Sequence, residues 1–282
     1  MAEPPPTGRA RASAEERRGA AAHYEDPVYY EQTYRRRRED VAFYAALAAK
    51  ARGPVLELGC GTGRVTRAMA RAGAEVVAVD RMASMLRYAR DRAEREPAAA
   101  RERVRFVRGD LRSVRLGRRF ALVVAPFNVL MHLYTRRDIE RCLATVRAHL
   151  TPRGRLVFDV LLPDPATLGR DPSRVYKGGR VRVDGVPHLY GERFSYDAAR
   201  QVEHVDLIFE RADGDRPAPP RVTPLAMRQL FPAELEALLH YNGLRIVRHE
   251  GGFEGEPLDR WSDSQVVFAR LRADHSRSST SQ

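Results

Sequence analysis

Short apolar runs alternate with longer, more polar segments along most of this chain. The apolar runs predict buried strands, and the segments between them have the lengths and end signals of helices. An uninterrupted apolar run such as Ala121–Ala125 is typical of a parallel strand covered on both faces. The order of the elements therefore predicts a doubly wound α/β fold. The predicted strands are Pro54–Leu58, Glu75–Asp80, Val104–Arg108, Ala121–Ala125 and Arg155–Leu161, and the predicted helices are Arg38–Ala51, Arg64–Gly73, Ala83–Arg95 and Arg137–Leu150.

The pattern changes after Pro163, where short alternating segments replace the apolar runs. Between Arg174 and Leu230 they are separated by the turn sequences Asp184-Gly185, Asp197-Ala198 and Asp213-Gly214-Asp215. Such spacing predicts an antiparallel β meander. The first pattern resumes with helix Pro232–Tyr241 and strands Leu244–Arg248 and Gln265–Leu271. We expect a disordered arm at 1–23, a core with an N-terminal lid at 24–163, an inserted substrate-side lobe at 164–230, completion of the core sheet at 231–272 and a flexible tail at 273–282.

A glycine-rich turn follows the first predicted strand. The segment Val55–Arg64 reads VLELGCGTGR, and the next strand ends in Asp80, 17 residues after Gly63. Glycines let a ligand approach the backbone closely, and an acid at this distance can accept the hydroxyls of a ribose. A dinucleotide fingerprint would need glycine at Arg64, and the Gly-Lys-Ser/Thr sequence of a phosphate-binding loop is absent. The pattern therefore predicts another nucleotide-type cofactor.

The glycine loop, Asp80 and Gly109-Asp110-Leu111 resemble the first three motifs of class I S-adenosylmethionine-dependent methyltransferases, in order and spacing. The resemblance implies a Rossmann-like, seven-stranded, mostly parallel sheet with an inserted antiparallel β lobe, and S-adenosylmethionine as cofactor. It implies that Asp80 holds the ribose, Asp110 and Leu111 the adenine, and that Glu57 lies near the ammonium group. The expected cofactor-binding residues are Glu57, Gly59, Cys60, Gly61, Thr62, Gly63, Asp80, Arg81, Met82, Asp110, Leu111 and Pro126.

The segment after strand 121–125 should face the methyl acceptor. DNA amino methyltransferases carry Asp/Asn/Ser-Pro-Pro-Tyr/Phe there, but this chain has Ala125 and Phe127 at the first and third positions, which disfavours DNA base methylation. The segment instead resembles methyltransferases of small metabolites, including amine and amino-sugar N-methyltransferases. Asn128 and His132, four residues apart, would share a face of a helical turn. His132 would act as a base on an alcohol acceptor; alternatively, it caps a turn or satisfies a core carbonyl.

Five tyrosines precede the first strand, namely Tyr24, Tyr29, Tyr30, Tyr34 and Tyr44. In many members of the resembling family an N-terminal segment folds over the cofactor and contributes a tyrosine, a role we assign to Tyr24 and Tyr34. The alternative is that these rings pack with their hydroxyls at the surface. With Asn128 and His132, the two tyrosines complete the expected catalytic set. Candidate acceptor contacts in the lobe are Tyr190, Arg193, Tyr196, His204 and Arg228.

Composition bounds the remaining properties. The 282 residues, 43% hydrophobic, suffice for one α/β domain with an elaboration. The net charge of +12 comes from dispersed arginines with a single run at 35–38, so nucleic acid is not an expected partner. No apolar stretch approaches the about 20 residues of a membrane span, which predicts no membrane association and a cytoplasmic location. Cys60 and Cys142 offer no disulfide framework, and no cluster has metal-ligand spacing.

Together these patterns predict an enzyme that transfers a methyl group from S-adenosylmethionine to nitrogen or oxygen of a small-molecule acceptor. The alternatives are methylation of RNA or protein, or a non-catalytic S-adenosylmethionine-binding protein. Alignment of the acceptor and exclusion of water would supply most of the catalysis, since orientation can lower a barrier by about 7–11 kcal/mol. The sequence is compatible with a homodimer but does not require one.

Overall fold

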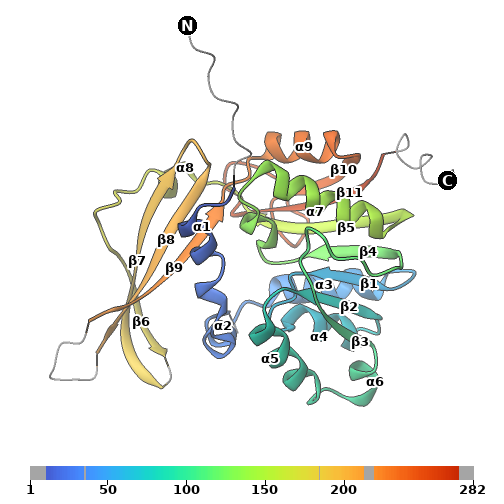
Figure 1. The fold of residues 1–282 in the computed structure, drawn as a ribbon, viewed down its shortest axis with the longest axis horizontal. Helices are drawn as coiled ribbons and strands as arrows, with labels where there is room; N and C mark the ends of the chain where they lie inside the picture. Colours follow the sequence, from blue (N-terminus) through green and yellow to red (C-terminus); the bar gives the residue numbers. More distant parts are fainter. Residues whose placement is uncertain (1–10, 35, 184, 213–218, 273–282) are drawn as a thin grey trace, which may run out of the picture.

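The computed structural model describes residues 11–34, 36–183, 185–212 and 219–272, which form two separate sheets (Figure 1). The larger sheet contains β1 (Val55–Leu58), β2 (Val76–Asp80), β3 (Val104–Arg108), β4 (Phe120–Ala125), β5 (Leu150–Leu161), β10 (Leu244–Glu250) and β11 (Ser264–Leu271). Its order is β10-β11-β5-β4-β1-β2-β3, and only the pairs made by β11 are antiparallel. The expected seven-stranded, mostly parallel sheet is confirmed.

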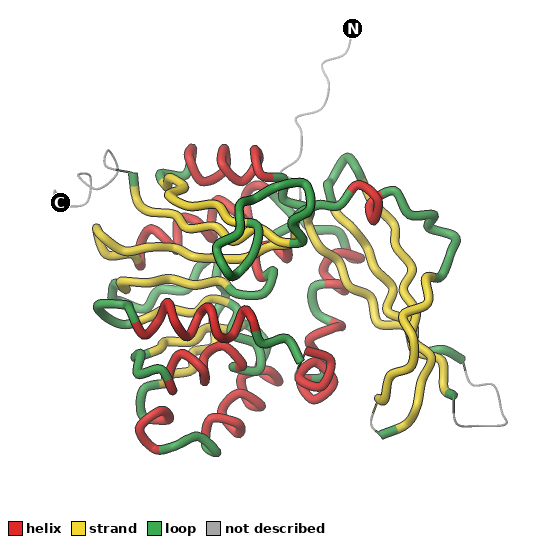
Figure 2. Tube along the Cα trace, turned by 180° about the vertical axis from the view of Figure 1, so that it is seen from behind, coloured by secondary structure: helices red, strands yellow, loops and turns green. Residues whose placement is uncertain are grey.

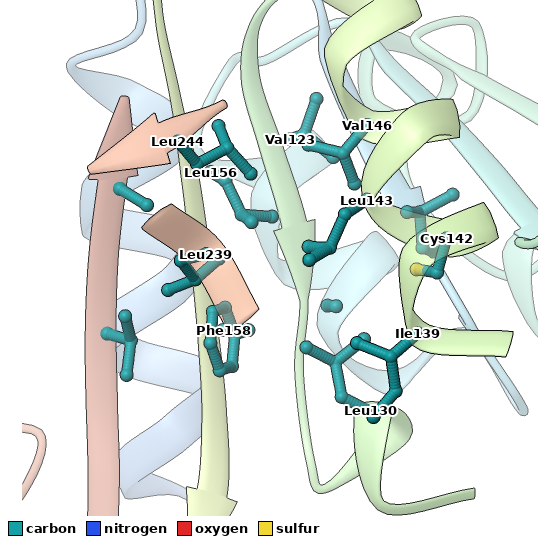
Figure 3. Packing of buried hydrophobic residues seen from close by; sticks show 14 of the residues in the cluster. Val123, Leu130, Ile139, Cys142, Leu143, Val146, Leu156, Phe158, Leu239 and Leu244 are labelled. Carbon is teal, nitrogen blue, oxygen red and sulfur yellow. The ribbon is translucent and has the colours of Figure 1, made fainter. Parts of the chain in front are cut away.

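Helices cover both faces of this sheet (Figure 2). Side chains alternate along each strand, so Val123 of β4 packs on one face while Leu122 and Val124 pack on the other. In Figure 3, Leu143 and Val146 lie beside Val123 in the first of these clusters. The covering helices of that face are α7 (Arg136–His149) and α9 (Pro232–Tyr241), and those of the other face are α3 (Glu39–Ala49), α4 (Arg64–Arg71) and α5 (Ala83–Ala93); α6 (Ala98–Arg101) is a short turn before β3.

The smaller sheet is the expected antiparallel meander, and it stands beside the core (Figure 1). The helix α8 (Pro165–Leu168) precedes it. Val205, Leu207 and Phe209 share one face of β8 and pack in a separate apolar cluster, as the alternation predicts. Asp184 and the Asp213–Asp215 turn lie outside the described residues. The strands are β6 (Tyr176–Val183), β7 (Val186–Asp197), β8 (Val202–Arg211) and β9 (Arg221–Arg228), in that order.

The expectation of a disordered arm at 1–23 is wrong for its described part. Residues 14–24 form α1 (Ala14–Gly19) and the 3-10 turn η1 (Ala22–Tyr24), followed by α2 (Pro27–Tyr34). Ser13 and Glu16 make a reciprocal capping box, which marks the start of a helix; the composition of the segment does not reveal it. The carboxylate of Glu16 is buried and pairs with Arg200 at 2.7 Å. Residues 1–10 and the predicted tail 273–282 lie outside the described residues.

The segment α1–η1–α2, which we call the lid, lies between the two sheets (Figure 1). Gly19 of α1 packs so closely on β9 that an added Cβ would lie 2.7 Å from the Cβ of Ala226. On α2, Tyr29 joins the apolar cluster of the smaller sheet. The lid therefore links the lobe to the core. No helix within the described ranges is long and apolar enough to cross a membrane.

Candidate active site

A cavity of about 1030 Å³, counted with the open solvent at its mouth, lies at the carboxyl ends of β1, β2 and β4. This is where ligands bind in open α/β sheets. The lid closes part of it, because Ala20, Tyr24 and Tyr30 belong to its lining. Of the expected cofactor residues, all but Gly63 line the cavity; Gly63 instead starts α4 in a left-handed conformation.

The glycine loop shows why two of its glycines are needed. At Gly59, with φ of 72°, an added Cβ would lie 2.6 Å from a methyl group of Val129. At Gly61, with φ of 53°, the same atom would meet no protein atom within 4 Å. Gly59 thus allows the loop to pack against the segment after β4. At Gly61, the lack of a side chain leaves free space in the cavity wall. The loop fits a ligand that contacts its backbone.

Asp80 ends β2 with both carboxylate oxygens held by backbone groups. The Gly61 N–H donates to Oδ2 and the Met82 N–H donates to Oδ1, each at 2.8 Å. Burial raises the pKa of Asp80, and the backbone donors counteract it. Each oxygen retains a further lone pair in the cavity wall. The carboxylate therefore fits the two hydroxyls of a ribose.

Asp110, after β3, is clamped by a residue that the sequence analysis missed. Arg112 donates to both oxygens of Asp110, the shortest distance being 2.6 Å, and to Asp138 at 2.9 Å. Burial alone would raise the pKa of Asp110, but the bonds and charge of Arg112 outweigh it and lower that pKa. The acid thus stays ionised and fixed. Sequence reasoning could have found this clamp, because an arginine follows the acid by two positions on the turn after β3.

Glu57 sits beneath the glycine loop and is 2% exposed. Burial raises the pKa of its carboxyl to about 8, against a hydrogen bond from the Thr66 hydroxyl. At neutral pH the side chain is therefore largely protonated. Because it also lines the cavity, an ammonium group placed beside it would restore its charge. This fits the expected position near the cofactor's ammonium.

The lid and the segment after β4 meet at Tyr24 and His132. The Tyr24 hydroxyl lies 2.6 Å from Nε2 of His132, and both residues line the cavity. Burial raises the pKa of Tyr24 well above its ordinary value, and burial also lowers the pKa of His132 to about 4. Both side chains are consequently neutral at physiological pH. The structure brings these two predicted residues together.

Hydrogen-bond partners fix the tautomer of His132. The Tyr134 hydroxyl donates to the Ala226 carbonyl at 2.8 Å, so it can only accept from Nδ1 of His132, 3.4 Å away. Nδ1 therefore carries the proton and Nε2 accepts from Tyr24. The oxygen of Tyr24 keeps lone pairs for a hydrogen bond from a ligand.

Two other predicted catalytic residues lie elsewhere. Asn128 precedes the 3-10 turn η2 (Val129–His132) and accepts from the Leu161 N–H at 2.9 Å, so it braces the loop and does not line the cavity. Tyr34 contacts His23 and Phe127 behind the cavity lining. On α2 the tyrosine that lines the cavity is Tyr30, which the sequence analysis included in the cluster but did not select. Helical spacing could not tell which ring of α2 points inward.

None of the candidate lobe residues lines the described cavity. Arg193 pairs with Asp206 at the surface, and Arg228 pairs with Glu234 and donates to the Tyr134 carbonyl. His204 faces Glu15 of α1, and Tyr190 donates to Glu192. The side chains do alternate along the strands of the lobe as predicted. Residues of the lid, however, pack on part of these strands, and none of the candidate residues reaches the cavity.

Comparisons with known proteins agree with this geometry. Residues 55–154 match a family model described as a methyltransferase domain. A dTDP-3-amino-3,6-dideoxy-alpha-D-glucopyranose N,N-dimethyltransferase of Streptomyces fradiae is 30% identical over 135 residues, 48% of this chain and 50% of that protein. The chain thus spans about half the length of this curated relative.

Solved structures extend the match beyond the domain. The CcbJ methyltransferase from Streptomyces caelestis has a TM-score of 0.71 at 29% identity, covering 84% of this chain and 90% of that chain. The glycopeptide N-methyltransferase MtfA, solved with S-adenosyl-L-methionine, has a TM-score of 0.59 at 25% identity, with 83% and 87% covered. These matches identify a methyltransferase domain at residues 55–154 and extend the similarity in fold to most of the chain.

Proposed function

We propose that this chain, whose core is a class I S-adenosylmethionine-dependent methyltransferase domain, methylates the nitrogen of a small-molecule amine. The observation that carries the proposal is the neutral, hydrogen-bonded Tyr24–His132 pair in the cavity wall. An amine attacks through its own lone pair and needs orientation more than a base. An alcohol acceptor would need a base, and a pKa of about 4 makes His132 a weak one.

In this proposal each residue of the site has its own role. Asp80, Asp110 and Glu57 hold the ribose, adenine and ammonium of the cofactor, which supplies a methyl group activated on a sulfonium when bound. The oxygen of Tyr24 accepts an N–H of the amine and turns its lone pair towards the methyl group. His132 keeps the Tyr24 hydroxyl in this orientation, and Tyr30 helps to exclude water.

The acceptor class follows from the relatives. The Streptomyces fradiae protein is named for dimethylation of an amino sugar and MtfA for N-methylation of a glycopeptide. We therefore propose an amino-sugar group, free or within a larger natural product, as the acceptor. These names favour a small molecule over the alternatives of RNA, a protein or a non-catalytic role.

The test is transfer of labelled methyl groups to a matched pair of acceptors. A nucleotide-linked 3-amino-deoxysugar and its 3-hydroxy counterpart are incubated with the protein, and the products are identified by mass. We expect label on the amine only, and at least tenfold less with His132→Ala. Label on the hydroxyl sugar would assign oxygen chemistry. Tight cofactor binding without transfer to either sugar, RNA or peptides would favour the non-catalytic alternative.

Three further properties belong to the proposal. The protein acts in the cytoplasm and without nucleic acid as a partner, and it is compatible with a homodimer. Cell fractionation, light scattering at working concentration and a nuclease-treated transfer assay test them separately. Label that disappears with nuclease treatment would contradict the last of them.

A further inference from the structure

The turn after β4 has an unusual backbone. Phe127 and Asn128 both adopt left-handed conformations, with φ of 60° and 61°, although neither is glycine. Such a conformation is uncommon for a residue with a bulky side chain and persists only where surrounding contacts enforce it. Strain of this kind gathers at ligand sites, and Phe127 lines the cavity here.

One buried side chain on the neighbouring strand enforces this turn. Oδ1 of Asp159, in β5, accepts the Phe127 N–H at 2.8 Å, and the Asp159 carbonyl accepts the Asn128 N–H at 3.2 Å. The Tyr44 hydroxyl of α3 donates to the same Oδ1 at 2.7 Å. Asp159 is 4% exposed and Tyr44 is fully buried. Both lie behind the turn, and neither lines the cavity.

The turn places the Phe127 ring beside side chains of α2 and of the core. Its centroid lies 4.8 Å from that of Tyr34 and 6.4 Å from that of Tyr30. The guanidinium groups of Arg37 and Arg64 lie 5.1 and 5.3 Å from the ring centroid. The ring thus connects the lid to the core at the cavity wall. A shift of the turn would move this ring, whereas the Gly61 and Met82 amides would still hold Asp80.

We propose that Asp159, with Tyr44 behind it, is a positioning residue for the acceptor: it holds the strained turn that places Phe127 in the cavity wall. The proposal rests on the proposed function for its kinetic consequence. The structural part of the proposal, that Asp159 restrains the Phe127 amide, can be tested without measuring any enzymatic activity. The residues assigned to the ribose, adenine and ammonium groups, Asp80, Asp110 and Glu57, belong to β2, the turn after β3 and β1, so their contribution should remain.

The test compares Asp159→Leu, which removes the acceptor oxygen, with Asp159→Asn, which retains one. His149→Ala serves as the control, because His149 is similarly buried, accepts the Leu116 N–H, and like Leu116 does not line the cavity. For Asp159→Leu we expect amide exchange at Phe127 to become at least about tenfold faster. The kcat/KM for the acceptor should fall about tenfold to a hundredfold, with cofactor Kd changed less than about threefold. Asp159→Asn should stay close to the wild type in all three measurements.

Three outcomes would overturn the proposal: unchanged exchange at Phe127 in Asp159→Leu, equal losses in the Leu and Asn variants, or equal losses in His149→Ala. If Asp159→Leu does not fold, Tyr44→Phe replaces it, with a smaller expected effect in the same direction and unchanged cofactor Kd. Should the wild type methylate no amine, the proposed function fails, whereas the exchange measurements still decide whether Asp159 restrains the turn.

Discussion

The two halves of the cavity are built in different ways. In the cofactor half, partners are close in sequence: Gly61 donates to Asp80 19 residues away, and Arg112 binds Asp110 two residues away. In the lid half, Tyr24 reaches His132 across 108 residues, and outside the cavity lining Arg200 holds Glu16 of the lid across 184 residues. One half therefore uses donors from nearby positions in the sequence, and the other uses side chains from distant segments. The first can form with the sheet alone, whereas the second requires the lid to dock.

The largest expected effect lies in the cofactor half. Asp80→Ala removes charge-assisted hydrogen bonds worth about 1.5–3 kcal/mol, so the affinity for S-adenosylmethionine should fall at least about tenfold by calorimetry. Asp91→Ala, which removes an exposed charge from α5, should leave the affinity unchanged. Equal affinities for the wild type and Asp80→Ala would contradict the ribose assignment.

The lid half should affect turnover more than cofactor binding. Tyr24→Phe removes the proposed acceptor of the amine N–H, so kcat should fall roughly tenfold while cofactor Kd stays within about threefold. Tyr241→Phe, at an exposed ring, is the control. A large change in cofactor Kd with unchanged kcat would show that Tyr24 binds the cofactor and would contradict the difference between the two halves.

Breaking the pair that docks the lid should have a smaller effect. Arg200→Ala leaves Glu16 without its partner, and because Arg200 is 34% exposed we expect a cost of about 1–2 kcal/mol rather than that of a fully buried pair. Amide exchange in α1 and cofactor dissociation should both become several-fold faster. Arg193→Ala, which breaks an exposed pair in the same lobe, should change neither. If both variants behave alike, the lid is held by other contacts.

The smallest expected effect is the release of a proton when the cofactor binds. Burial raises the pKa of Glu57 to about 8, and a cofactor ammonium beside it would lower that pKa again. Cofactor binding at pH 7 should therefore release close to one proton, measured by calorimetry in two buffers of different ionisation enthalpy. Glu57→Gln should abolish the release. Uptake of a proton on binding to the wild type would have the wrong sign for this assignment.

Much of the cofactor half was predictable because each part has a local cause. Glycines end β1, an acid ends β2, and the turn after β3 carries Asp110, so spacing along the chain reports spacing in the sheet. Arg112 was missed although its signal is local. The lid could not be read in the same way: composition suggested disorder, while Ser13, Glu16 and a distant arginine order it.

The sequence by itself determined the sheet and its glycine loop, because these depend on hydrophobic period and turn chemistry over a few residues. The same motifs carried the resemblance that implies S-adenosylmethionine as the cofactor. Only the tertiary structure decided that Tyr30 rather than Tyr34 lines the cavity, and that Asn128 braces a turn. It also decided that His132 is neutral and that Asp159 lies behind Phe127. These properties depend on which distant groups pack together and exclude water, and no local pattern records that.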